Sequence, residues 1–163
     1  MDTESSVPLR QWGTRIEQAL GIQLGIREDG AFALRSKGGA LVGVEPMAGT
    51  RGVALNGELG KSGSLPDRTL RALLAVNLAP GLSGTGFIGL VPQTDALILR
   101  MFWTPAEPEW TEDAFMAIFT TFAEHVDSLA AAISSRDIDR IVETSDSADG
   151  TAPHPPHDTL NRA

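Results

Sequence analysis

The sequence predicts an α+β fold in which a twisted antiparallel sheet is flanked by three helices, in the order helix, strands, helix, strands, helix. Three stretches carry apolar residues at intervals of three and four, the spacing of a helix with one buried face. Between them, apolar residues alternate with polar ones or form short runs, as in strands. Short turn signals join neighbouring strand segments, which favours antiparallel pairing. With 163 residues, the chain is long enough for one domain with a substantial core.

The first helix is predicted to have Ser6 as its N-cap and Pro8 in its first turn. Its apolar face consists of Leu9, Trp12, Ile16 and Leu20. Gly21 is expected to end the helix, because glycine readily closes a last turn.

Four strands are predicted next, over residues 22–26, 32–34, 41–45 and 52–55. Asp29-Gly30 is a strong hairpin signal, and Lys37-Gly38-Gly39 predicts another turn. Pro46 is expected to end the third of these strands, since proline has no N–H to donate to the ladder. The pair Asn56-Gly57 predicts a turn after the fourth.

The second helix is predicted after its N-cap Ser64 and before Pro80-Gly81. Two strands follow, over residues 86–91 and 96–103, with a turn at residues 92–95. The later strand is apolar on both faces apart from Arg100, which predicts a place inside the sheet or at an interface. Thr111 is expected to cap the long third helix. The apolar face of that helix consists of Phe115, Ile118, Phe119, Phe122, Val126, Leu129 and Ile133.

The composition changes after Ser134 and divides the chain into two parts. Residues 1–134 form the predicted α+β domain. Residues 135–163 hold few apolar residues, no phenylalanine, tryptophan or tyrosine, and a proline-rich end. They cannot bury enough apolar surface to offset the entropy of ordering, so we expect a disordered acidic tail. Its first residues, Arg136 to Val142, are expected to extend the third helix weakly.

Composition and charge exclude several kinds of function. The formal net charge is −8, which speaks against nucleic acid or an anionic membrane as the main partner. The chain has no cysteine, so disulfides, thiol nucleophiles and cysteine-ligated metals are excluded. No apolar stretch approaches the roughly 20 residues that span a bilayer, and the start of the chain has no signal-peptide pattern. We therefore expect a cytoplasmic protein.

Candidate catalytic patterns are incomplete. Gly60-Lys61-Ser62 resembles the end of a phosphate-binding loop, but Leu55 stands where that loop needs a glycine. His125 has no histidine or carboxylate four positions along its helix, and His154 with His157 would be two metal ligands without a third. We expect no metal, no cofactor and no enzymatic activity.

A loose apolar pattern surrounds the second helix. Residues 69–78 read TLRALLAVNL, and a glycine-rich loop, the strand GFIGL at 86–90, a PQTD turn, the strand ALILR at 96–100 and an aromatic pair follow. The region from about residue 9 to residue 133 resembles the class I chaperones of bacterial type III secretion, the Tir chaperone family. This resemblance implies a homodimer that binds the extended, non-globular N-terminal segment of one or more secreted effectors and keeps it soluble and secretion-competent. It also implies that the protein uses no nucleotide and catalyses no bond chemistry.

The resemblance implies two sets of site residues. The first helix and the sheet would offer apolar grooves to the effector segment, at Leu9, Trp12, Ile16, Leu24, Ile26, Phe32, Leu34, Val42 and Val44. The second helix and the strand after it would build the dimer interface, at Leu70, Leu73, Leu74, Asn77, Phe87 and Ile88. An unfolded partner can add a strand to a free sheet edge. The secretion ATPase is a further candidate partner, for the tail.

Two alternatives to an effector chaperone remain. A regulatory adaptor of the same fold would bind a folded signalling protein, and copurification with the products of neighbouring genes would separate these two functions. A small-molecule enzyme would need a bound cofactor or a deep polar pocket, which the sequence patterns do not reveal.

Overall fold

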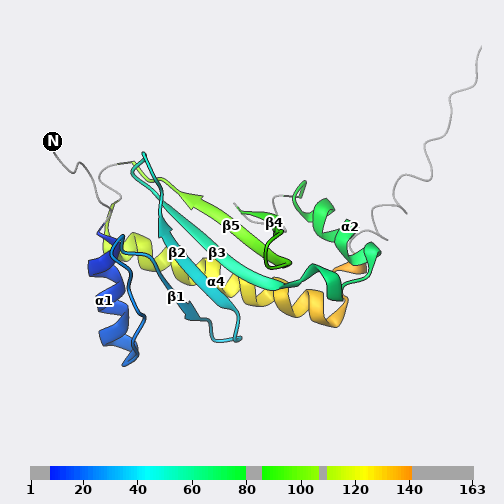
Figure 1. Ribbon diagram of the computed structural model, residues 1–163, viewed down its shortest axis with the longest axis horizontal. Helices are drawn as coiled ribbons and strands as arrows, with labels where there is room; N and C mark the ends of the chain where they lie inside the picture. Colours follow the sequence, from blue (N-terminus) through cyan, green and yellow to red (C-terminus); the bar gives the residue numbers. More distant parts are fainter. Residues whose placement is uncertain (1–7, 80–85, 107–109, 141–163) are drawn as a thin grey trace, which may run out of the picture.

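The computed structural model describes residues 8–79, 86–106 and 110–140 of the chain. Its elements are α1 (Leu9–Leu20), β1 (Phe32–Arg35), β2 (Leu41–Pro46), β3 (Val53–Lys61), the 3-10 turn η1 (Ser62–Ser64), α2 (Asp67–Val76), β4 (Phe87–Val91), β5 (Ala96–Trp103) and α4 (Glu112–Ser135). The strands form one antiparallel sheet in the order β1-β2-β3-β5-β4. Helix α4 crosses one face of this sheet, α1 lies near β1, and α2 lies at the opposite end near β4 (Figure 1). The predicted α+β fold is confirmed.

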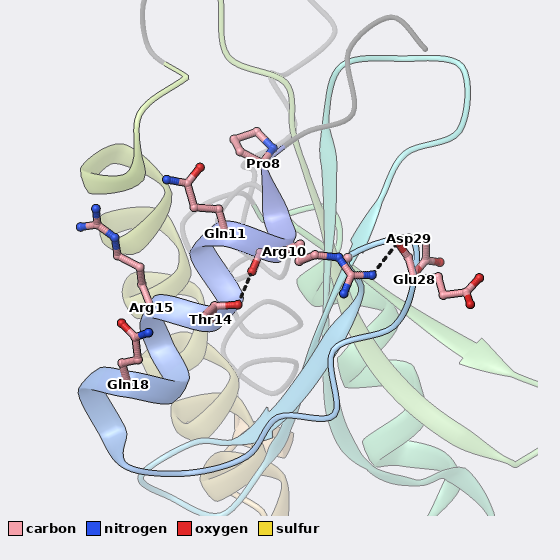
Figure 2. Close-up of a pocket in the computed structure, with 9 residues that line it drawn as sticks. Pro8, Arg10, Gln11, Thr14, Arg15, Gln18, Glu28 and Asp29 are labelled. Atoms are coloured by element: carbon pink, nitrogen blue, oxygen red, sulfur yellow. Dashed lines mark hydrogen bonds between the residues drawn. The ribbon is translucent and has the colours of Figure 1, made fainter.

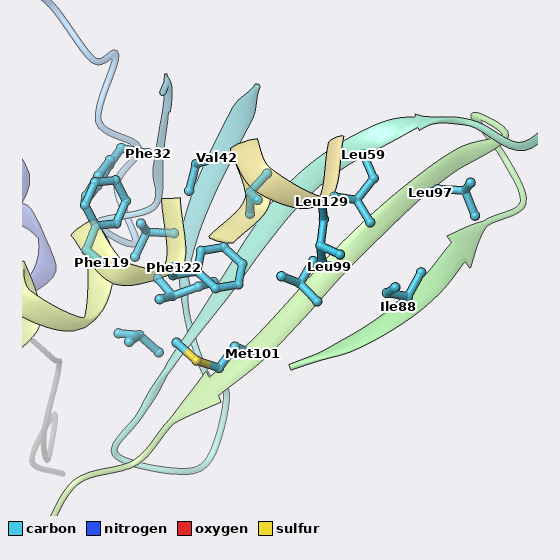
Figure 3. Packing of buried hydrophobic residues seen from close by; sticks show 14 of the residues in the cluster. Phe32, Val42, Leu59, Ile88, Leu97, Leu99, Met101, Phe119, Phe122 and Leu129 are labelled. Atoms are coloured by element: carbon cyan, nitrogen blue, oxygen red, sulfur yellow. The ribbon is translucent and has the colours of Figure 1, made fainter. Parts of the chain in front are cut away.

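The core lies between α4 and the sheet face that α4 covers (Figure 3). Thr111 caps α4 as predicted, because its Oγ1 accepts a hydrogen bond from Ala114 N–H at 3.1 Å. The buried side of the helix consists of Phe115, Phe119, Phe122, Val126, Leu129 and Ile133. By strand register, the side chains that share this sheet face are Phe32, Leu34, Val42, Val44, Val53, Leu55, Leu99 and Met101. The opposite face is not covered by any helix in the described part of the chain.

The predicted turn at Asn56-Gly57 is wrong, because β3 continues through it to Lys61. A Cβ atom on Gly57 would lie 2.1 Å from Val126 Cγ2. The missing side chain therefore lets α4 approach β3 closely. In this strand, glycine serves helix–sheet packing rather than a turn.

The predicted strand over residues 22–26 is also wrong. Gly25 adopts a left-handed φ of 59°. The Leu24 N–H donates to the Glu17 carboxylate at 2.7 Å instead of to a neighbouring strand. The turn at Asp29-Gly30 is present, but among the described residues no backbone hydrogen bond joins residues 22–26 to β1.

The start of α2 and the segment after α4 differ from expectation. Ser64 is not a helix cap: α2 begins at Asp67, and the Ser64 hydroxyl donates to the Lys61 carbonyl at 2.8 Å. Helix α4 ends where Arg136 takes a left-handed φ of 65°, so the expected weak extension is interrupted. Residues 136–140 instead fold back toward α2, with Ile138 fully buried. The expected cap Ser6, the expected stop at Pro80-Gly81 and the tail from residue 141 lie outside the described residues.

Candidate functional site

Strand β1 is an edge of the sheet, paired only with β2. The turn between the two strands is closed by a hydrogen bond from Ser36 N–H to the Ala40 carbonyl, at 2.8 Å. Hydrogen-bonded pairs alternate along an antiparallel ladder, so the N–H and C=O groups of Ala33 and Arg35 point away from β2. These outward groups, which we call the β1 edge, can receive another strand.

A hollow of about 300 Å³, the edge hollow, lies beside the start of β1. Its lining residues are Leu24, Gly25, Arg27, Ala31, Phe32, Ala33, Gly43, Val44 and Glu45. Three predicted effector-binding residues, Leu24, Phe32 and Val44, therefore come together here. Ala33 and Gly43 lie opposite each other in register, and because both residues are small, no bulky side chain fills the hollow at this point.

The other predicted effector-binding residues lie deeper. Leu9, Trp12, Ile16 and Val42 are at most 3% exposed. The indole of Trp12 stacks on Phe115, with ring centroids 4.7 Å apart. Ile26 and Leu34 are partly buried against the same core. The sheet face that was expected to be open is thus the face that α4 covers, and sequence periodicity could not tell the two apart.

The opposite edge of the sheet is blocked at its centre. The Asn77 side chain, at the end of α2, donates to the Ile88 carbonyl at 3.0 Å and accepts from the Ile88 N–H at 2.7 Å. One amide side chain thereby satisfies both backbone groups of this β4 residue, as a neighbouring strand would. Asn77 was expected at a dimer interface, and nothing in the sequence signals this contact between α2 and β4.

Apolar side chains remain exposed around α2 and β4. We call this set the α2–β4 surface: Leu74 at 66% exposure, Leu78 at 87%, Phe87 at 44% and Leu90 at 51%. Leu74 and Phe87 were among the residues predicted for the dimer interface, whereas Leu78 and Leu90 were not. Of the other predicted residues, Leu73 and Ile88 are buried within the chain, and Leu70 is partly buried. Phe87 also contacts the exposed Phe102, with ring centroids 5.7 Å apart.

A second hollow, of about 590 Å³, lies over the outer side of α1 (Figure 2). It is lined by Pro8, Arg10, Gln11, Thr14, Arg15, Gln18, Glu28, Asp29 and Gly30. The Arg10 guanidinium donates to the carbonyls of Arg27 and Glu28, at 2.8 and 2.9 Å. Arg15 lies 3.3 Å from the Glu112 carboxylate. Both arginines of this hollow therefore already bind groups of the chain itself.

Solved structures with a similar fold include secretion chaperones bound to partners. A chain of the ExsC–ExsE complex matches with a TM-score of 0.65 at 16% identity, over 82% of this chain and 97% of that one. A chain of the HopA1–SchA chaperone–effector complex matches with a TM-score of 0.56 at 14% identity, over 78% and 99%. A chain of the complex between the Yersinia pestis type III secretion chaperone SycH and a stable fragment of YscM2 matches with a TM-score of 0.49 at 16% identity, over 74% and 98%. No protein-family model and no curated protein matches the chain.

The chain has the fold of a class I type III secretion chaperone. Within the described part of this chaperone fold, no three histidine, cysteine, aspartate or glutamate residues are grouped so that they could hold a metal ion. Lys61 of the incomplete phosphate-loop pattern donates to the Thr94 carbonyl at 3.1 Å. None of the helices in that part of the chain is long and apolar enough to span a membrane.

Proposed function

We propose that the chain is a cytoplasmic type III secretion chaperone. It binds the non-globular N-terminal segment of one or more effectors and keeps that segment soluble and secretion-competent. The observation that carries the proposal is the β1 edge with its adjoining hollow, in a fold shared with a chaperone–effector complex. The interaction requires no cofactor and makes or breaks no covalent bond.

The effector segment binds by adding a strand to β1. The outward backbone groups of Ala33 and Arg35 hydrogen-bond to it regardless of its sequence, and the edge hollow receives an apolar side chain against Leu24 and Phe32. Strand addition occurs at β1 rather than at β4 because Asn77 already occupies the centre of the β4 edge. Since one such hollow is small, a long effector segment would extend along further shallow apolar surface.

The proposed functional unit is a homodimer. The α2–β4 surface is apolar, exposed and at the end of the sheet away from β1, so a second copy can cover it while both β1 edges stay accessible. The secretion ATPase is a proposed further partner.

Strand addition can be tested by removing one backbone donor. Ala33→Pro deletes an outward N–H of the β1 edge without deleting a hydrogen bond to β2, and proline is tolerated at such edge positions. The full-length protein would be co-expressed with the products of neighbouring genes, and captured partners would be identified by mass spectrometry. We expect the unmodified chain to capture an effector and Ala33→Pro to lose most of it.

The matched control is Ala33→Thr, which keeps the N–H and suits a strand. It should retain the partner. Equal capture by the proline variant, with the sheet intact by circular dichroism, would rule out strand addition at β1.

A further inference from the structure

The side chains around the β1 edge include several cations, although the chain as a whole is acidic. Arg35 and Lys37 are exposed at the end of β1 and in the turn after it. Among the described residues, neither has a carboxylate within ion-pair distance. Arg27 lines the edge hollow, and 70% of its side chain is exposed. Its guanidinium forms an ion pair with the Asp29 carboxylate at 3.4 Å. The formal net charge of the chain is nevertheless −8.

Two carboxylates lie nearby, one at the turn after β1 and one on β2. Asp127 accepts hydrogen bonds from the Ser36 hydroxyl and, at 2.8 Å, from the Gly38 N–H. Glu45 on β2 lies 3.6 Å from the Arg100 guanidinium. Asp127 keeps its negative charge, so the end of β1 and the turn after it carry two cations, Arg35 and Lys37, against this one carboxylate, and the local charge is positive.

The pleat of β1 determines which side chains an added strand meets. Phe32 and Leu34 point to the α4 side, whereas Ala33 and Arg35 point to the uncovered face. Side chains directly across a strand pair share a face, and opposite charges there are favourable. An added strand thus meets apolar groups on one face. On the other it meets the exposed guanidinium of Arg35, which donates one hydrogen bond to the Gly39 carbonyl at 2.9 Å and has no carboxylate partner among the described residues.

We propose that the β1 edge selects extended segments in which apolar residues alternate with acidic ones. The apolar residues lie beside Phe32 and Leu34, and an aspartate or glutamate lies beside Arg35. This inference rests on the proposed strand addition and adds to it the chemical class of the partner segment.

The test uses two synthetic fluorescent peptides and the full-length protein. Both peptides have about ten residues, with valine at every second position so that they can form a strand. Of the positions between the valines, some hold serine for solubility. The others hold glutamate in one peptide and lysine in the other. Binding is measured by fluorescence anisotropy near physiological salt. We expect the glutamate peptide to bind about two- to fivefold more tightly, as for a cross-strand charge pair.

Arg35→Glu should reverse that preference, while Arg71→Glu should not. Arg71 is exposed on α2, at the other end of the sheet, and its reversal changes the net charge equally. If both peptides bind equally to the unmodified chain and to Arg35→Glu, the acidic preference is wrong although strand addition stands. If neither peptide binds, strand addition at β1 fails together with the preference.

Discussion

Gly57 lies where Val126 of α4 packs against the sheet, and this position has no room for a methyl group. Its Cβ would meet both methyl groups of Val126, at 2.1 and 2.8 Å, so Gly57→Ala has to push α4 away from β3. We expect a loss of about 1–3 kcal/mol in the free energy of unfolding, typical of overpacking. Urea denaturation followed by circular dichroism measures it.

Gly89 on β4 supplies the matched control, because a Cβ there meets nothing within 4 Å. Gly89→Ala should leave the free energy of unfolding unchanged or raise it slightly. Adding Val126→Ala to the Gly57→Ala chain should recover part of the loss. If Gly57→Ala is as stable as Gly89→Ala, the close approach of α4 to β3 is not what this glycine serves.

Some residues with local roles could be predicted from the sequence, although Ser64 was not; residues whose roles depend on distant elements could not. Thr111 caps α4 and Gly21 ends α1 because the partner groups lie within a few positions. The role of Gly57 was misjudged and the contact of Asn77 with Ile88 was not foreseen, because both depend on residues that only the folded chain brings near. The same reason applies to Trp12, whose stacking on Phe115 of α4 the sequence did not indicate.

At the scale of elements, the segment after α4 joins two helices. Asp139 lies 2.7 Å from the Arg68 guanidinium, Arg136 donates to the Thr69 hydroxyl at 3.2 Å, and Ile138 is fully buried. This segment therefore holds α2 against the end of α4. We expect Ile138→Ala to cost about 2–5 kcal/mol of unfolding free energy, as for other buried isoleucines, and urea denaturation would show it. A change below 0.5 kcal/mol, the usual size at surface sites, would contradict this role.

The same contact should depend on pH through Asp139. Burial raises the pKa of its carboxyl, but the Thr69 hydroxyl and the Arg68 guanidinium outweigh it, and the pKa lies below the ordinary 3.8. A carboxyl with a lowered pKa stabilises the fold above its unfolded pKa, and that contribution is lost as pH falls through the folded value. Asp139→Asn should thus be less stable at pH 7, and the difference should shrink below about pH 4. A difference in melting temperature that is constant from pH 7 to pH 3 would contradict the assignment.

Hydrophobic periodicity predicted α4 and β5 correctly. The stripe of α4 and the apolar run of β5 matched, because one packs on a single sheet face and the other is paired on both sides. The stretch 22–26 alternates like a strand, yet Gly25 and the Glu17 carboxylate direct its backbone elsewhere. Alternation of apolar and polar residues indicates that a segment can form a strand. Whether it does also depends on side-chain acceptors that compete with a neighbouring strand for its backbone N–H groups.

At the scale of the whole molecule, the two proposed binding surfaces lie at opposite ends of one sheet. The β1 edge offers backbone groups and a cationic flank, whereas the α2–β4 surface offers exposed apolar side chains. Under the proposed function, this separation would let one chain bind an effector segment and a second copy at the same time. The net charge of −8 doubles in a symmetric dimer, which favours solubility for a protein with exposed apolar surface.

The proposed dimer is best tested at Leu74, whose side chain is 66% exposed in the single chain. Leu73, although predicted for the same interface, is 2% exposed, and a charge there would unfold the domain instead. We expect Leu74→Asp to weaken the dimer about a hundredfold or more, because an unpaired charge buried at an interface costs roughly 3 kcal/mol. Analytical ultracentrifugation should show about twice 17.3 kDa for the unmodified chain and a monomer for the variant.

Leu20→Asp is the matched control, since Leu20 is 58% exposed on α1, at the end of the sheet away from α2. It should remain dimeric and melt like the unmodified chain. If the unmodified chain sediments as a monomer at micromolar concentration, the homodimer is wrong. If both aspartate variants stay dimeric, the chain associates through another surface, and the exposed leucines around α2 and β4 would then have to serve the effector or the secretion ATPase.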